Sequence, residues 1–245
     1  MFSDKHVLIL SGISGILNLI TCVAVAITWT YWSNTLNTCT GSGNCECVLY
    51  GEIRGSSFVG GTPLGCRTVT YTSLALTIVS FAVAAVYLIK IRNSQPGSLH
   101  RSAQSEEAIA QKRFTCRNKQ RFPLLLKIVA GIVTLLMFVE AITLSEGYWQ
   151  TCNQYKTIVN KVLRASGDLS DLVMDRFSCS TMYDFMDFLQ PDPILRYPYT
   201  TQYYYPRRTT RINTGYILLA SVIFSWISVA LWSAITIFVG FCKYK

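Results

Sequence analysis

The sequence predicts an all-α membrane protein, in which four transmembrane helices form a bundle and the loops on one side form a small, disulfide-stapled extracellular domain. Of the 245 residues, 51% are hydrophobic and only 14% are charged, whereas a soluble domain carries about 25% charged residues. Four apolar runs reach the roughly 20 residues that a helix needs to cross a bilayer. Six of the nine cysteines lie in two of the three segments between these runs.

The four runs set the expected organisation of the chain. Their number is even, so both termini are expected on the same side of the membrane. The expected segments are residues 1–30 (cytoplasmic N-terminus and span one), 31–67 (extracellular loop one), 68–89 (span two), 90–123 (basic cytoplasmic loop), 124–147 (span three), 148–211 (extracellular loop two) and 212–245 (span four and a short cytoplasmic tail).

Charge predicts the orientation. Segment 90–127 contains nine Lys and Arg against two Glu, whereas segment 31–67 contains two basic and two acidic residues. Cytoplasmic loops are enriched in Lys and Arg, so 90–127 and both termini are expected in the cytoplasm of a multi-pass plasma-membrane protein. Segment 148–211 has eight basic and six acidic residues, but a loop of this length is translocated largely regardless of its charge.

Six cysteines are expected on the oxidising side, where an even number favours three disulfides. They are Cys39, Cys45, Cys47, Cys66, Cys152 and Cys179. Cys45 and Cys47 are too close in sequence to pair with each other, so each is expected to reach elsewhere, for example to Cys39 and Cys66. Cys152 and Cys179 suggest a bridge within the second loop or back to the first. A metal site built from these thiols is the alternative, and no cofactor is expected.

Span one is long and lacks a small-x-small cleavage site, so it is predicted to be retained and not removed as a signal peptide. Asn18 is expected to bond across the bundle, with a pore-lining role as the alternative. In the first loop, the β-branched and aromatic stretches at 47–50 and 66–71 predict short strands. Small residues four apart are expected to allow close helix packing in spans one, two and four, at Ser11 and Gly15, Ser80 and Ala84, and Ser221 and Ser225.

The cytoplasmic side is predicted to contact the membrane surface. A basic cluster is expected to bind anionic phospholipids at the inner leaflet, with a specific partner site as the alternative. Its members are Lys112, Arg113, Arg117, Lys119 and Arg121. A short helix is expected to begin near 105–107. Cys242, beside the basic C-terminal tail, is a palmitoylation candidate on motif grounds.

Span three contains Glu140, the one acidic side chain expected within hydrocarbon. Lys127 and Glu146 are about 28 Å apart on a helix and bracket the span. An ionisable group inside it is costly unless it is paired, hydrogen-bonded, protonated or hydrated. The hypothesis is that Glu140 faces protein and stays dry; the alternatives are pairing to a partner chain and hydration in a pore.

The second loop is predicted to contain helices and an extended strap. Apolar positions at helical spacing over 158–173 are expected to form two helices interrupted at 166–168, and a third amphipathic helix is expected between Cys179 and Pro191. The following strap is either packed on the extracellular domain or a protein-binding surface, because Tyr and Arg are enriched at interfaces. Its candidate contact residues are Tyr197, Tyr199, Tyr203, Tyr204, Tyr205, Arg207 and Arg208. Binding of nucleic acid is not expected on the outside of a membrane.

Enzymatic activity is not expected. The chain has two histidines, both outside the spans, and none of the common hydrolase, nucleotide-binding or metalloprotease motifs. The scarcity of polar residues at the expected midplane also disfavours a transporter.

The four-span layout with a cysteine-bearing first loop resembles the broad claudin-like and channel γ-subunit class, although the first loop lacks the W-x-x-G-L-W-x-x-C signature. The chain also resembles the transmembrane protein 179 family, through Cys47-Val48-Leu49-Tyr50-x-Glu52, Cys66-Arg67, Gly147-x-Trp149 and Cys152. Cys39, Cys45 and the Tyr-rich strap depart from that family. The resemblance implies a four-span architecture and no particular activity.

Three functions are compatible with these patterns. The favoured one is an accessory subunit that packs beside a larger channel or receptor. The alternatives are a pore-forming subunit with Glu140 in the pore, and a claudin-like adhesion protein that acts through its loops.

Overall fold

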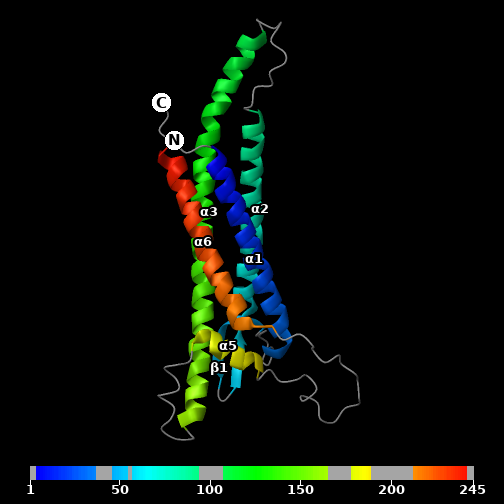
Figure 1. Ribbon diagram of the computed structural model, residues 1–245, viewed down its shortest axis with the longest axis vertical. Coiled ribbons are helices and arrows are strands. Elements are labelled where there is room, and N and C mark those ends of the chain that lie inside the picture. The colour runs from blue at the N-terminus through cyan, green and yellow to red at the C-terminus, as the bar shows by residue number, and fades with distance from the viewer. Residues whose placement is uncertain are drawn as a thin grey trace, which may run out of the picture. The chain divides into compact units, whose positions relative to one another are not determined.

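The computed structural model describes residues 4–36, 46–54, 57–93, 107–164, 178–188 and 212–241. In chain order the elements are α1 (Asp4–Leu36), β1 (Cys47–Arg54), β2 (Ser57–Gly61), α2 (Pro63–Asn93), α3 (Glu107–Arg164), α5 (Cys179–Phe188) and α6 (Thr214–Phe241). Figure 1 shows the four long helices, coloured from blue α1 to red α6.

Within the described residues, four helices are long and apolar enough to cross a membrane. They occupy Asp4–Ser33, Pro63–Asn93, Leu126–Lys161 and Thr214–Val239. Large apolar side chains remain exposed along each of them, for example Ile16, Ile78, Leu135 and Ile223. Extended exposed apolar surface is typical of a face that meets lipid. The predicted four-helix membrane fold is confirmed to this extent.

The chain divides into two compact units. Unit 1 comprises 1–19, 74–139 and 225–245, and unit 2 comprises 20–73 and 140–224. Each long helix contributes to both units, and consecutive helices pass from one unit to the other in alternating directions. Both strands and α5 belong to unit 2.

Small residues bring α1 and α2 together in unit 1. A Cβ atom added at Gly15 would lie 3.1 Å from the Phe81 ring, and Ser11 and Ser80 are fully buried. The predicted packing role of these small residues is confirmed. The helices are also joined by an ion pair between Lys90 Nζ and Asp4 Oδ2 at 2.9 Å.

Asn18 differs from its prediction. It is buried, but its Nδ2 donates to Ser14 Oγ at 3.4 Å, one turn earlier on the same helix. The described bond therefore runs along α1 and not across the bundle. A serine four residues away satisfies the amide locally, because residues i and i+4 lie on the same helix face.

Helix α3 is longer than predicted. It runs without interruption through 58 residues, about 87 Å of helix, whereas the hydrocarbon core is about 30 Å thick. Helix α3 thus combines three segments that were expected to be separate: the short helix near 107, span three and the first part of the 158–173 helix. No Gly or Pro occurs from 148 to 164 to end it, and the expected break at 166–168 lies outside the described residues.

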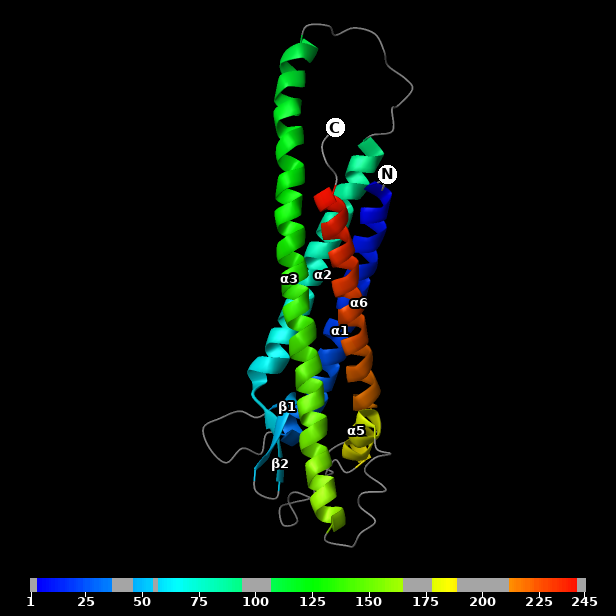
Figure 2. The same cartoon turned by 90° about the vertical axis from the view of Figure 1, so that its left-hand side faces the viewer.

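Of the two strands predicted in the first loop, one is present and the other is not. Residues 47–50 lie in β1, which pairs antiparallel with β2 (Figure 2). Residues 66–71 are helical, because α2 already begins at Pro63. Proline is favoured in the first turn of a helix, where its missing N–H costs no hydrogen bond, and it overrides the strand preference of the β-branched residues that follow.

Candidate functional site

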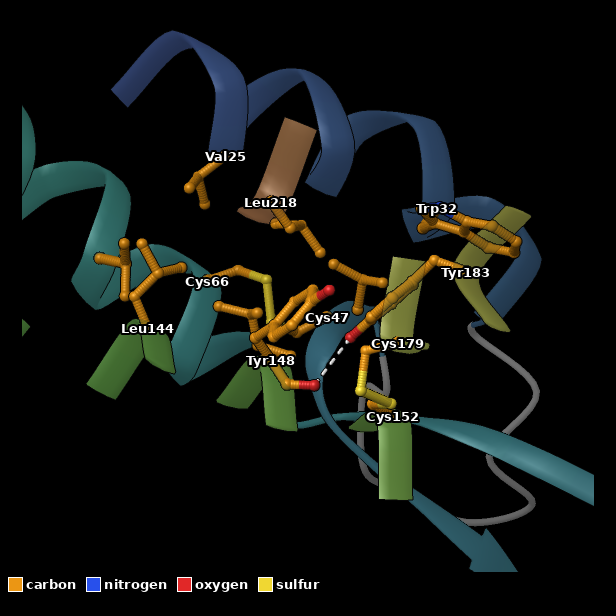
Figure 3. Close-up of a cluster of buried hydrophobic side chains, with 13 residues drawn as sticks. Val25, Trp32, Cys47, Cys66, Leu144, Tyr148, Cys152, Cys179, Tyr183 and Leu218 are labelled. Atoms are coloured by element: carbon orange, nitrogen blue, oxygen red, sulfur yellow. Dashed lines mark hydrogen bonds between the residues drawn. A yellow bond between two sulfur atoms is a disulfide. The ribbon is translucent and has the colours of Figure 1, made fainter. Parts of the chain in front are cut away.

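The core of unit 2 gathers side chains from the four long helices, β1 and α5. Its largest fully buried members include Trp32 of α1, Leu49 of β1, Tyr148 of α3, Tyr183 of α5 and Leu218 of α6. Figure 3 shows the rings of Tyr148 and Tyr183 stacked beside the two disulfides. The Tyr183 hydroxyl donates to the Tyr148 carbonyl oxygen at 3.1 Å. The core is therefore both apolar and covalently braced.

Two disulfides connect these elements in the described part of the chain. Cys47 of β1 pairs with Cys66 of α2, and Cys152 of α3 pairs with Cys179 of α5. All four cysteines of these bridges are buried. The first pair agrees with the suggested partner of Cys47, and the second is a bridge within the second loop, one of the two alternatives. Cys39 and Cys45 lie outside the described residues, so the third predicted disulfide stays a prediction.

The Tyr50 ring occupies a slot that two glycines leave open. A Cβ atom at Gly147 of α3 would lie 2.9 Å from Tyr50 Cε2, and one at Gly65 of α2 would lie 3.2 Å from Cδ2. The Tyr50 hydroxyl donates to the Thr143 carbonyl oxygen at 2.8 Å. The Tyr50 backbone has φ 60°, a conformation that L-residues adopt rarely and at a cost. The contacts of the ring offset that cost.

Thr151 joins α3 to the first strand. The backbone N–H of Gly51 donates to Thr151 Oγ1, and Thr151 Oγ1 donates to the Val48 carbonyl oxygen, both at 2.9 Å. One hydroxyl thus satisfies a donor and an acceptor of β1, as a neighbouring strand would. Because unpaired buried backbone groups are costly, this contact fixes β1 against the helix.

The start of α6 is held by a second polar cluster. Trp32 Nε1 donates to Thr214 Oγ1 at 2.8 Å, and Thr214 Oγ1 donates to Asp187 Oδ1 at 2.6 Å. The Thr214 N–H donates to Asp187 Oδ2 at 2.7 Å, and Asn213 Oδ1 accepts from the Tyr216 N–H at 3.2 Å. Acidic and amide side chains at a helix N-terminus satisfy N–H groups that lack intrahelical partners. Asp187 therefore connects α5, α6 and α1.

Burial raises the pKa of Asp187 from 3.8 to about 6; the bonds from Thr214 lower it, and Asp184 raises it. The folded state thus favours the protonated acid, and this contribution to stability is full below pH 3.8 and is lost as the pH rises through about 6. We expect unit 2 to be more stable at pH 5 than at pH 7.5 by about 1 kcal/mol, allowing for partial solvent screening of this side chain. Thermal unfolding of wild type and Asp187→Asn at both pH values measures the difference, and an equal pH dependence in the two proteins would contradict it.

Glu140 is buried among the helices of its own chain. Only 5% of the residue is exposed, and Ser73 of α2 lies within hydrogen-bond distance of Glu140 Oε1. Nearby, Cys22 Sγ of α1 donates to the Thr70 carbonyl oxygen of α2 at 3.4 Å. Within the described residues, Glu140 therefore faces protein.

The remaining candidates lie where the structure gives no side-chain detail. The basic cluster falls on the helical backbone of α3, but its side chains are outside the described residues. The strap residues Tyr197, Tyr199, Tyr203, Tyr204, Tyr205, Arg207 and Arg208, and the lipidation candidate Cys242, are outside them as well. Their predicted roles stay predictions.

Several residues that organise the site were not singled out from the sequence. Trp32 and Thr214 are 182 positions apart, and Thr214 and Asp187 are 27 apart, so no local pattern joins them. For Gly147, in contrast, the sequence contains a local signal. A glycine after a long apolar run marks either a helix end or a close approach of another element. Here the helix continues, which leaves the close approach to Tyr50.

Comparisons of the chain with known protein families, curated proteins and solved structures found no match. The class therefore follows from the chain itself. Four apolar helices of sufficient length indicate a multi-pass α-helical membrane protein. Two disulfides brace its unit 2.

Proposed function

We propose that the chain is a non-enzymatic accessory subunit of a larger channel or receptor complex in the plasma membrane. The observation that supports this most directly is the position of Glu140. It is the one acidic side chain between Lys127 and Glu146. Its hydrogen-bond partner, Ser73 of α2, belongs to the same chain. A carboxyl group used inside one chain is not available to line a pore between identical chains.

The bundle is built for packing. Buried serines and threonines are spread over the apolar helices, including Ser11, Ser73, Ser80, Ser221 and Ser228. Small and hydroxylated residues let helices approach closely in a membrane and contribute modest hydrogen bonds. Packing of this kind supports a protein that assembles with others more than one that conducts ions.

In this proposal unit 2 faces the oxidising outer side, with both termini in the cytoplasm. Disulfides persist in oxidising compartments and are rare in the cytosol, and both described disulfides belong to unit 2. Unit 1 contains the starts of α1 and α3, the ends of α2 and α6, and the basic segment 90–127. The resulting arrangement satisfies the positive-inside rule.

Unit 2 would present a rigid surface to the partner's outer domain. Disulfides, the Tyr50 slot and the Asp187 cluster fix its elements to one another, which reduces the ordering cost of binding. Asp187 and Thr214, which flank the segment containing the Tyr- and Arg-rich strap, bond to each other. The proposed partner is a membrane protein, with anionic phospholipids at the inner leaflet.

We expect a tagged chain, purified from native membrane in mild detergent, to carry a channel or receptor subunit with it in fixed proportion. We expect the chain alone, reconstituted in vesicles, to give no conductance. The co-purification control is an unrelated four-span protein of similar expression. A cation conductance that disappears in Glu140→Gln would support the pore alternative instead, and clustering of cells that express the chain alone would support adhesion.

A further inference from the structure

The surroundings of Glu140 determine where one proton resides. Ser73 Oγ lies 2.9 Å from the Val69 carbonyl oxygen, and it also contacts Glu140 Oε1. These two oxygens both accept hydrogen bonds when the carboxyl group is ionised. A serine hydroxyl has a single proton, so it can donate to one acceptor at a time.

Both contacts are satisfied at once only when Glu140 carries a proton. The carboxylic acid then donates to Ser73 Oγ, and Ser73 donates to the Val69 carbonyl oxygen. If Glu140 were ionised, either the carbonyl or the carboxylate would face a lone pair of Ser73 Oγ in a buried site, where such a mismatch is costly. We propose that Glu140 is a proton-binding site inside the bundle, occupied as a neutral carboxylic acid whose hydrogen bond ties α3 to α2.

The apolar helix segments around Glu140 contain no basic side chain that could pair with an ionised carboxylate, and Arg67 of α2, six residues before Ser73, has its guanidinium over the Trp29 ring at 5.9 Å. The apolar segments 7–29, 68–89 and 214–241 of the packed helices contain no Lys, Arg or His. Lys127, on the same helix, is 13 residues away, about 20 Å along the axis. The neighbour from α1 is Cys22, whose side chain bonds to the Thr70 carbonyl oxygen and cannot carry a positive charge to pair with a carboxylate. A neutral acid avoids the cost of an unpaired charge in this setting.

The proposal does not depend on the partner or on the accessory role, since every group that it uses belongs to this chain. Glu146, six residues further along α3, is exposed, whereas Glu140 is buried.

Infrared difference spectroscopy tests the protonation state directly. We expect the full chain, reconstituted in lipid at pH 7, to show the carbonyl stretch of a protonated carboxyl group, and this band to be absent in Glu140→Gln. Glutamine retains an N–H donor for Ser73 Oγ and is close in shape, so the fold is expected to persist. Glu146→Gln is the matched control in the same helix, because this carboxyl group is exposed, and it should leave the protonated band unchanged.

A second variant covers the case in which Glu140→Gln does not fold. Ser73→Ala removes the acceptor and keeps the acid, so the protonated band should remain and shift to the frequency of a weaker hydrogen bond. Loss of carboxylate bands in Glu140→Gln, or a carboxyl region unchanged by Ser73→Ala, would overturn the proposal.

Discussion

Replacing both Cys47 and Cys66 with alanine is expected to lower the free energy of unfolding of the chain by about 2–5 kcal/mol, the usual cost of losing a disulfide in a small braced domain. The bridge closes a loop with a sequence separation of 19, and it fixes β1 to the start of α2. Both residues are fully buried in the unit 2 core, so the loss also removes packing.

Unfolding midpoints in detergent measure this effect. Reducing the wild-type protein should destabilise it further than the double variant alone, because reduction also opens Cys152–Cys179. Substitution of the buried free cysteine Cys22 by alanine is the control for removing a thiol that is not bridged. Free thiols at Cys47 or Cys66 in the folded, unreduced chain would contradict the expectation.

The four helices could be predicted from the sequence because a membrane leaves few alternatives. Every backbone polar group within hydrocarbon must be bonded internally, so a long apolar run becomes a helix. The close approach of another helix at Gly15 was also predictable, since small residues four apart mark a helix face that a neighbour can approach closely, but its partner Phe81 was not. The burial of Glu140 followed from the cost of exposing an acid to lipid.

The parts that could not be predicted depend on contacts between distant residues. Residues 66–71 have strand propensity, but propensity is a weak preference that tertiary context overrides. Here the context is a helix start at Pro63 and a bridge from Cys66 to β1. The Trp32, Thr214 and Asp187 cluster joins three separate elements, and a single sequence contains no pattern that links them.

The partner of the Asn18 Nδ2 group could not be predicted for a similar reason. An amide in a membrane helix needs a partner, and the sequence alone does not say whether that partner is on the same helix or on another. Ser14 was available one turn away. Local bonds of this kind also occur in the unfolded chain within a membrane, so they contribute little to association between helices.

Gly147→Ala is expected to destabilise unit 2 by about 1–3 kcal/mol, the usual cost of overpacking a tight contact. The added Cβ atom would lie 2.9 Å from Tyr50 Cε2 and 3.0 Å from Leu49 Cβ. The Tyr50 ring has little room to move, because Gly65 also borders its Cδ2 and Cε2 atoms and its hydroxyl is bonded to the Thr143 carbonyl oxygen. Displacing the ring would therefore break the contact between β1 and α3.

Gly131→Ala is the matched control, because it lies in the same helix and its added Cβ would meet no atom within 4 Å. Alanine favours helix over glycine by about 1 kcal/mol, so this variant should be neutral or slightly stabilised, and the difference between the two variants isolates the clash. Tyr50→Leu in the Gly147→Ala background should recover part of the loss, since the ring atoms are removed and Leu49 Cβ remains. Strictly additive effects of the two substitutions would show that the ring does not occupy the slot, because residues in contact are expected to couple by at least about 0.5 kcal/mol.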